Sequence, residues 1–232
     1  MFWRFLLAGI LGGVCYLDRT AACQLMLHRP LVAATLMGAI FGNFHAGAQV
    51  GIVLELIYLV HLPVGASLPP DDTGAAIFAG SAAAAASTGT FLDGGSFTAL
   101  ILLSVVFAEL GKGVDALVRK INGRIARITR DSVDRGDLKG VEHGLLAGLT
   151  LFGTVGFLLS LSFSGAGVAV STYLLPRFGT QLQLDFNALQ PVLPLVGAAS
   201  VFTCGRTEKT AVFFFLMMAI AFWATVLFKW VV

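Results

Sequence analysis

The chain has 232 residues, of which 57% are hydrophobic and 12% are charged, with a mean hydropathy of +0.87 and a net charge of +2. The charged share is about half of the roughly 25% found in soluble globular proteins. Lipid can cover apolar surface on every side of a helix and water cannot, so this composition excludes an ordinary soluble domain. It predicts one all-α polytopic membrane domain over residues 1–232.

The first part of the chain, residues 1–108, is predicted to be the N-terminal membrane half. Phe5 to Leu17 is shorter than the roughly 20 residues needed to cross a bilayer, so it either continues toward Leu27 or enters only partway. Leu31 to Leu54 holds no Asp, Glu, Lys or Arg and is long enough to span, although its glycines favour a break or close packing. Thr73 to Leu92 is also uncharged, and its many Ala and Gly residues predict a closely packed helix.

Acidic residues persist where cations are absent. Between Pro30 and Gly111 there is no Lys or Arg, yet five acids remain: Glu55, Asp71, Asp72, Asp93 and Glu109. A charge at the bilayer centre costs about 2.5–3.5 kcal/mol or more, so an acid in such a stretch is a functional candidate. Three of these acids flank a Pro/Gly-rich break at residues 63–72.

The sequence leaves two readings for each of these acids. Glu55 is either a carboxyl at the membrane surface or one that faces a cavity, and its two apolar flanks favour the cavity. Asp71 and Asp72 are either loop residues or caps for the helix beginning at Thr73, and one can cap while the other lines a site. We expect Pro63 to Asp72 to form a non-helical tip at membrane depth, where irregular backbone is tolerated only beside a polar cavity.

Residues 109–143 form the one strongly charged segment and hold eight of the 15 Lys and Arg residues. The bias of cations toward the inside of the membrane predicts that this segment is cytoplasmic. Apolar residues from Val114 to Ile128 recur at three- and four-residue steps, which predicts an amphipathic helix that lies on the inner membrane surface or docks to a partner. The segment has no Phe, Tyr or Trp, which argues against a nucleic-acid partner.

Residues 144–232 are predicted to be the C-terminal membrane half. Gly144 to Pro176 is uncharged and is either one tilted span with a partial one, or two short segments divided near Ser162 to Gly165. Leu189 to Cys204 and Thr210 to Phe228 close the chain. The whole chain then has about eight or nine apolar segments, several of them re-entrant or broken helices, a pattern typical of secondary transporters.

No pattern of residues indicates catalysis within this chain. There is no phosphate-binding Gly-rich loop and no nucleophile paired with a base. Each histidine, His28 among them, lacks a second ligand at metal spacing, so a polar lining role is the simpler interpretation. The three cysteines show no paired spacing. We expect no catalytic residue, metal, cofactor or disulfide.

The order of motifs resembles one known family, the IIC membrane subunits of the mannose/fructose/sorbose phosphotransferase systems. The resemblance is specific over about residues 20–80 and agrees in layout to about residue 145. Its motifs are His28-Arg29-Pro30-Leu31-Val32-Ala33, Gly38 with Gly42-Asn43, Leu54-Glu55, Val64-Gly65-Ala66 and Pro70-Asp71.

The resemblance implies a multi-pass sugar permease subunit in a bacterial inner membrane, which pairs with a IID membrane subunit. Cytoplasmic IIA and IIB subunits would relay the phosphoryl group, so this chain would carry no phosphohistidine. The resemblance also implies a homo-oligomer of IIC–IID units. The candidate substrate-binding residues are Glu55, Asp71, Asp72, His28 and Asn43.

The chain also departs from that family. Cys23, Gln24 and Met26 stand where the family usually has an acidic pair and a Gln, and Gly51-Ile52-Val53 stands where it favours Gly-Gly-Thr. Two other functions therefore remain open beside sugar translocation. One is a regulatory or scaffold remnant of such a system, and the other is an ion-coupled carrier that uses Glu55 and the aspartate pair.

Overall fold

The computed structural model describes residues 1–22, 24–60, 68–177 and 192–204, and these form helices and connecting turns with no strand. The prediction of an all-α chain is confirmed over this part. The helices, in chain order, are α1 (Phe2–Thr20), α2 (Pro30–Phe41), α3 (Phe44–Tyr58), α4 (Asp72–Ala86), α5 (Gly94–Asp134), α6 (Leu138–Ala169) and α8 (Val192–Cys204).

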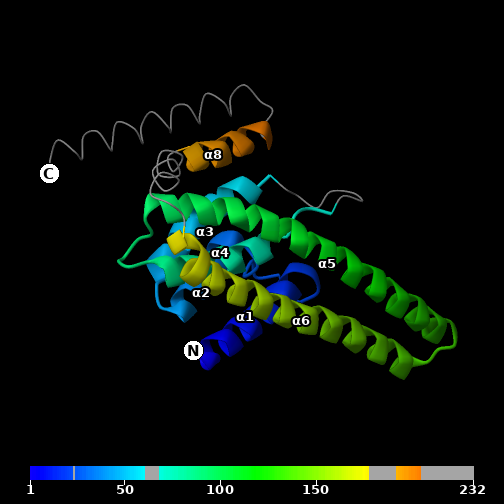
Figure 1. Ribbon diagram of the computed structural model, residues 1–232. Coiled ribbons are helices and arrows are strands. Elements are labelled where there is room, and N and C mark those ends of the chain that lie inside the picture. The colour runs from blue at the N-terminus through cyan, green and yellow to red at the C-terminus, as the bar shows by residue number, and fades with distance from the viewer. Residues whose placement is uncertain (23, 61–67, 178–191, 205–232) are drawn as a thin grey trace.

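Two long helices, α5 and α6, lie side by side as an antiparallel hairpin whose closed end projects from the remaining helices (Figure 1). α6 continues through a π-helical turn, Val170–Leu174, and a 3-10 turn, Leu175–Arg177. Both helices are long and apolar enough to cross a membrane. At 1.5 Å per residue α5, with 41 residues, is about 60 Å long and α6, with 32 residues, is about 48 Å long, so both exceed the hydrocarbon thickness of about 30 Å.

The hairpin answers two questions about where helices begin and end. The sequence left one of them open and suggested a different boundary for the other. The amphipathic residues after Glu109 do not begin a new helix, because α5 runs unbroken from Gly94 to Asp134. The uncharged residues from Gly144 onward form one helix through Ala169, so the division near Ser162 is not present. Neither stretch contains a proline that would break its helix.

The predicted span from Leu31 to Leu54 is broken at Gly42 into α2 and α3. Gly42 has a φ of +108°, and the N–H groups of Gly42 and Asn43 both donate to the Gly38 carbonyl, at 2.9 and 2.8 Å. Asn43 then caps α3 by accepting from the Ala46 N–H at 3.0 Å. A Cβ at Gly38 would lie 2.7 Å from the Gly47 Cα, so the two helices approach at a distance that only glycine allows.

Helix α4 is the centre of the fold. Every residue from Thr73 to Ala84 is buried, and α2, α3, α5 and α6 all pack against this helix. Its small side chains permit this, as predicted, although the helix ends at Ala86 rather than near Leu92. The Phe78 ring stacks on Phe107 of α5, with ring centroids 3.9 Å apart.

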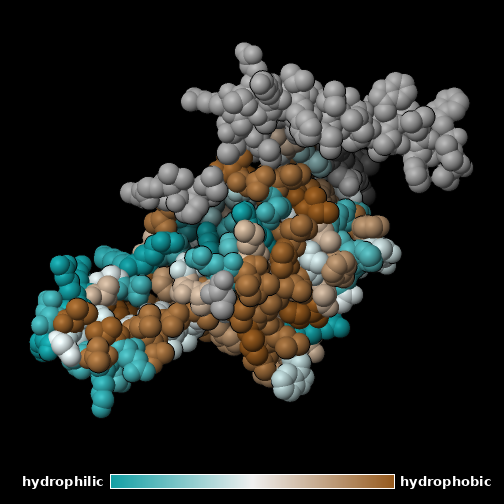
Figure 2. All heavy atoms as spheres, turned by 180° about the vertical axis from the view of Figure 1, so that it is seen from behind, coloured by the Kyte–Doolittle hydropathy of each residue, from teal (hydrophilic) through white to brown (hydrophobic). Residues whose placement is uncertain are grey.

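Helix α1 packs along α6 and continues through Asp18 and Arg19 to Thr20, which is the first of the two alternatives for the N-terminal segment. The Ser160 hydroxyl of α6 donates to the Ala8 carbonyl at 2.6 Å. Apolar side chains cover much of the molecular surface in Figure 2, and they include exposed residues of α1, α5 and α6. Such a surface requires lipid or a partner to cover it.

Candidate functional site

Charged side chains gather where the end of α1, the beginning of α2, the last turns of α3 and the beginning of α4 meet. The Thr73 hydroxyl of α4 donates to the His28 carbonyl at 3.0 Å and so joins two of these helix ends. We call this group the charged cluster. Its members are Asp18, Arg19, His28, Arg29, Glu55, Asp71 and Asp72.

Asp71 is the most deeply buried member, with a side chain only 1% exposed. Its Oδ1 accepts the Gly74 N–H at 3.1 Å, so Asp71 is the N-cap of α4. Oδ1 also pairs with the Arg19 guanidinium, and Oδ2 accepts from the Tyr16 hydroxyl. Both carboxylate oxygens are therefore occupied, and Asp71 anchors α1 to α4.

The neighbouring acid, Asp72, is only partly occupied. Its Oδ1 lies 3.3 Å from Arg19 Nη2 and accepts the Thr73 N–H at 2.9 Å. Within the described residues its Oδ2 accepts no hydrogen bond, and the side chain is 19% exposed. Asp72 can therefore accept a hydrogen bond from a bound molecule.

Asp18 fixes the loop between α1 and α2. Its carboxylate accepts from the backbone N–H groups of Leu25 and His28, and it lies 2.8 Å from His28 Nδ1. The loop turns sharply at Gln24 and Met26, whose φ values of 50° and 64° are uncommon for residues other than glycine. A neutral His28 ring that donates from Nδ1 keeps Nε2 as an acceptor.

Glu55 stabilises the beginning of α2 from a different helix. Its Oε2 accepts the Leu31 N–H at 3.2 Å, and its Oε1 lies 3.5 Å from Arg29 Nη1. Arg29 precedes α2 but gives it no side-chain cap, so Glu55 supplies the acceptor and the negative charge that a helix N-terminus favours. The Glu55 side chain remains 22% exposed.

The structure brings four of the five candidate residues together and leaves Asn43 apart. Asn43 follows the far end of α2, about 18 Å along the helix from Pro30. Its amide donates to the Ser87 hydroxyl at 2.7 Å and to the Gly89 carbonyl at 2.8 Å. These contacts hold the turn before α3 against the end of α4.

Three members of the cluster, Asp18, Arg19 and Arg29, were not among the candidates from sequence. Asp18 and Arg19 are adjacent and cannot face each other on a helix, so the sequence indicated no ion pair for either residue. Each one in fact pairs with a different segment. The cost of burying a charge made Glu55 a candidate, and it applies equally to Asp18 and Arg19. The same argument could therefore have identified these two residues from the sequence.

The expected non-helical tip is only partly within the described residues. Leu68 to Asp71 is not helical, which agrees with the expectation, and Pro63 and Gly65 lie outside the described residues. The described residues hold no group of three His, Cys, Asp or Glu side chains placed for a metal ion. What the cluster offers is a set of partly exposed hydrogen-bonding groups beside the N-termini of two short helices.

Comparisons with known proteins agree with this architecture. The family described as the PTS (phosphotransferase system) sorbose-specific IIC component matches residues 2–230. The mannose-specific EIIC component of Escherichia coli K12 is 27% identical over 217 residues, which cover 91% of this chain and 76% of that protein. The fructose permease IIC component of Bacillus subtilis 168 is 30% identical over 115 residues, covering 50% of this chain and 40% of that one.

Two solved structures share the fold. One, described only as a membrane protein, has a TM-score of 0.75 at 21% identity and covers 98% of this chain and 94% of its own. The other is a chain of the mannose transporter ManYZ in complex with microcin E492, with a TM-score of 0.63 at 22% identity and coverage of 95% and 86%. Together with the family match over nearly the whole sequence, these findings show that the chain belongs to the sorbose-type IIC component family of the sugar phosphotransferase systems.

Proposed function

We propose that this IIC permease component carries a hexose-like sugar across a bacterial inner membrane, for phosphorylation by a IIB partner. The observation that carries this proposal is the charged cluster itself. It places partly exposed acceptors from the loop before α2, from α3 and from α4 in one location, inside a chain whose family consists of sugar-specific permease components.

Within the cluster we assign direct sugar contacts to Glu55, Asp72 and His28. Carboxylate oxygens accept hydrogen bonds from sugar hydroxyls, and charge-assisted bonds of this kind are among the stronger ones. Asp71 has both oxygens occupied, so we assign it the role of holding Arg19 and the beginning of α4 in position. Asn43 acts at the other end of α2, where it holds the turn into α3.

The lengths of the helices and the positions of the cations support an arrangement of the chain in the membrane. Helices α2 and α3, with 12 and 15 residues, are each too short to span and are joined by a tight turn, so we propose that they enter the membrane as a re-entrant pair. The closed end of the α5–α6 hairpin, within residues 109–143, is placed on the cytoplasmic side. Segments outside the described residues, including Thr210 to Phe228, would complete the eight or nine apolar segments.

We propose that the chain works with a IID membrane subunit and with IIA and IIB phosphocarriers, as a homo-oligomer of IIC–IID units. The exposed apolar faces of α1 and α6 and the short helices support this, because such elements need neighbours. Expression with and without a IID subunit, followed by size measurement in detergent, tests the claim. A monodisperse protein that transports sugar on its own would contradict it.

The transport function itself is tested by uptake of radiolabelled mannose, fructose and sorbose in cells that lack other systems for these sugars. With all four subunits present, we expect one of these sugars to accumulate in phosphorylated form. Accumulation of unmodified sugar driven by an ion gradient would identify an ion-coupled carrier instead. An assembled complex that accumulates none of the three sugars would favour a scaffold and would overturn the proposal.

A further inference from the structure

An open groove of about 480 Å³ lies at the end of the bundle opposite the closed end of the hairpin, where α8 lies beside α3 and α5 begins (Figure 1). His45 and Gln49 of α3 line one side, Phe91 and Phe97 line the beginning of α5, and Pro194 belongs to α8. Among the described residues that line the groove there is no Asp, Glu, Lys or Arg. The groove therefore favours a neutral ligand, and it is separate from the charged cluster.

The groove and the charged cluster lie at different depths along two helices. On α3, His45 lies about 15 Å along the helix from Glu55. On α5, Phe97 lies about 16 Å from Ala108, whose carbonyl accepts the Asp71 N–H at 3.0 Å, and the residues between Phe97 and Ala108 carry no charge. Because the closed end of the hairpin is placed on the cytoplasmic side, the charged cluster lies toward the inner boundary of the membrane and the groove toward the outer one. We call it the outer groove.

The side chains of the outer groove combine aromatic rings with unused hydrogen-bonding groups. Phe91 is 64% exposed, and its ring centroid lies 5.8 Å from that of His45. Within the described residues the His45 ring forms no hydrogen bond, so its nitrogens can donate to a ligand and accept from it. Gln49 is held by Leu92, whose N–H donates to Oε1 at 2.9 Å and whose carbonyl accepts from Nε2 at 3.5 Å. These two bonds fix the segment that carries Phe91 against α3 and leave one amide hydrogen of Gln49 unused.

These groups suit a neutral sugar better than a lipid chain or a phosphorylated sugar. A hexose presents C–H groups on the faces of its ring, which pack on an aromatic ring, and hydroxyls around its edge, which bond to an imidazole or an amide. An acyl chain would cover the aromatic rings but would leave the polar groups of His45 and Gln49 without partners. A phosphate group would find no Lys or Arg among the described lining residues. The chemistry points to the sugar before it is phosphorylated.

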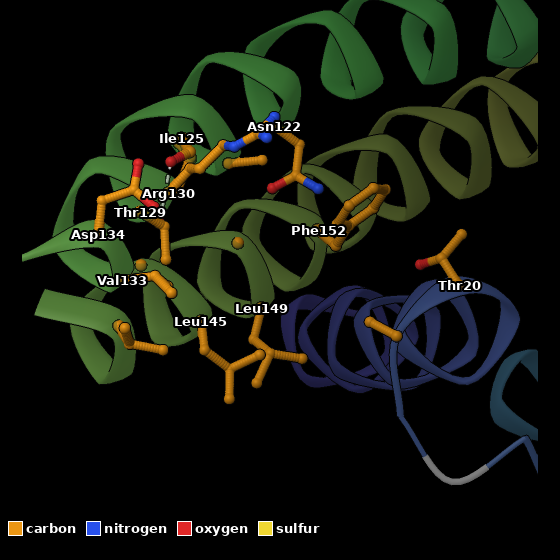
Figure 3. Close-up of a pocket in the computed structure, with 15 residues that line it drawn as sticks. Thr20, Asn122, Ile125, Thr129, Arg130, Val133, Asp134, Leu145, Leu149 and Phe152 are labelled. Atoms are coloured by element: carbon orange, nitrogen blue, oxygen red, sulfur yellow. Dashed lines mark hydrogen bonds between the residues drawn. The ribbon is translucent and has the colours of Figure 1, made fainter. Parts of the chain in front are cut away.

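A larger groove, of about 700 Å³, lies between the distal halves of α5 and α6 and does not fit this role (Figure 3). It lies near the closed end of the hairpin, which is placed in the cytoplasm, so a sugar that arrives from outside cannot enter there first. Its charged lining is one cation and one acid, Arg130 and Asp134, and much of the rest, such as Leu145 and Leu149, is apolar. Nothing in that lining selects a particular ligand.

We propose that the outer groove is an entry site, which holds the neutral sugar at the outer face before the sugar reaches the charged cluster. Phe91 covers one face of the sugar ring, and His45 and Gln49 bond to its hydroxyls. Ile52, which also lines the groove, lies about one helical turn from Glu55, so the inner end of the groove approaches the cluster along α3. Because it lacks a charged acceptor, this site holds the sugar more weakly than the cluster does. The inference rests on the proposed sugar transport and adds a second site to it.

Ala48→Cys tests this site, because it places a thiol in the outer groove without removing a side chain that contacts the sugar. The variant is made in a chain whose three native cysteines are replaced by serine. It is produced with a IID subunit but without phosphocarriers, so that sugar binds and is not phosphorylated. An impermeant thiol reagent is added to intact cells with mannose, fructose or sorbose. We expect labelling from outside, and slower labelling in the presence of the sugar that the complete system takes up. Adding Phe91→Ala is expected to raise the sugar concentration that halves the labelling rate about fivefold.

Thr88→Cys is the matched control, because Thr88 is exposed in the loop before α5 and does not line the groove. We expect this variant to be labelled from outside at the same rate with and without sugar. Glu55→Gln, which acts at the charged cluster, should leave the protection of Ala48→Cys in place.

Three results would overturn the entry site. They are labelling of Ala48→Cys that no sugar slows although the complete system takes up sugar, labelling only after the inner face is exposed, and protection that is lost with Glu55→Gln. The first result would leave the proposed transport standing. Absence of uptake by the complete system would instead contradict the transport itself, and the entry site with it.

Discussion

Asp71→Asn tests the anchor that joins α1 to α4. The change keeps an acceptor for the Gly74 N–H but removes the negative charge opposite Arg19, whose side chain is only 13% exposed. Removing one partner of a buried ion pair typically costs about 3–5 kcal/mol, because the other charge is left uncompensated. Asp72 and the Pro70 carbonyl still lie 3.3 Å from the guanidinium and offset part of this cost, so we expect a loss at or below the lower limit of that range, about 2–3 kcal/mol.

Thermal unfolding of the purified protein in detergent measures this loss. For a chain of this size about 1 kcal/mol lowers the melting temperature by roughly 2–4 °C, so Asp71→Asn is expected to lower it by about 5–10 °C. Asp93→Asn is the matched control, because Asp93 caps α5 through a 2.9 Å bond to the Ser96 N–H but is exposed and forms no ion pair within the described residues. The double variant Arg19→Gln/Asp71→Asn should recover part of the loss, since no charge is left buried alone. Equal shifts for Asp71→Asn and Asp93→Asn would refute the anchor.

Two further predictions concern the packing and the orientation of the chain. Gly47→Ala places a Cβ 2.8 Å from the Gly38 Cα, so it is expected to destabilise the α2–α3 pair by about 1–3 kcal/mol. Gly113→Ala, with nothing within 4 Å of the added methyl, is expected to leave the melting temperature unchanged or raised, and equal melting temperatures for the two variants would contradict the close approach. Arg130→Cys, in a chain whose three native cysteines are replaced by serine, is expected to react with an impermeant thiol reagent only after the inner face is exposed. Rapid reaction from outside intact cells would reverse the orientation proposed for the hairpin.

Several features of the fold follow directly from the sequence. The low charge and the long uncharged runs give the all-helical membrane character, and the Ala- and Gly-rich run after Asp71 forms the closely packed α4. Asp71 at the beginning of that run is a cap, one of its two predicted readings. These features depend on local composition and on neighbours within one helical turn, which a single sequence displays.

The features that sequence left open depend on contacts between distant segments. Whether the Leu31–Leu54 run is one span or two helices is decided by the close approach of Gly38 to Gly47, which the spacing of glycines suggests but does not fix. The partner of Arg19 lies 52 residues away, across the α2–α3 pair. Asp18 gains its partners only because Leu25 and His28, in the loop before α2, fold back over it. A charged residue near a helix end indicates that it needs an ion-pair or hydrogen-bond partner, but the sequence does not show which residue that partner is.

Sugar binding by Glu55→Gln tests the central claim most directly. The change keeps the shape of the side chain and removes a charged acceptor, whose hydrogen bonds typically contribute about 1.5–3 kcal/mol. Since about 1.4 kcal/mol corresponds to tenfold in affinity, we expect the dissociation constant of the transported sugar to rise by roughly ten- to a hundredfold. Lys112→Gln, which only breaks an exposed pair with Glu109, should leave it unchanged. Unaltered sugar binding by Glu55→Gln, at a normal level of protein in the membrane, would contradict the assignment of the charged cluster as the sugar site.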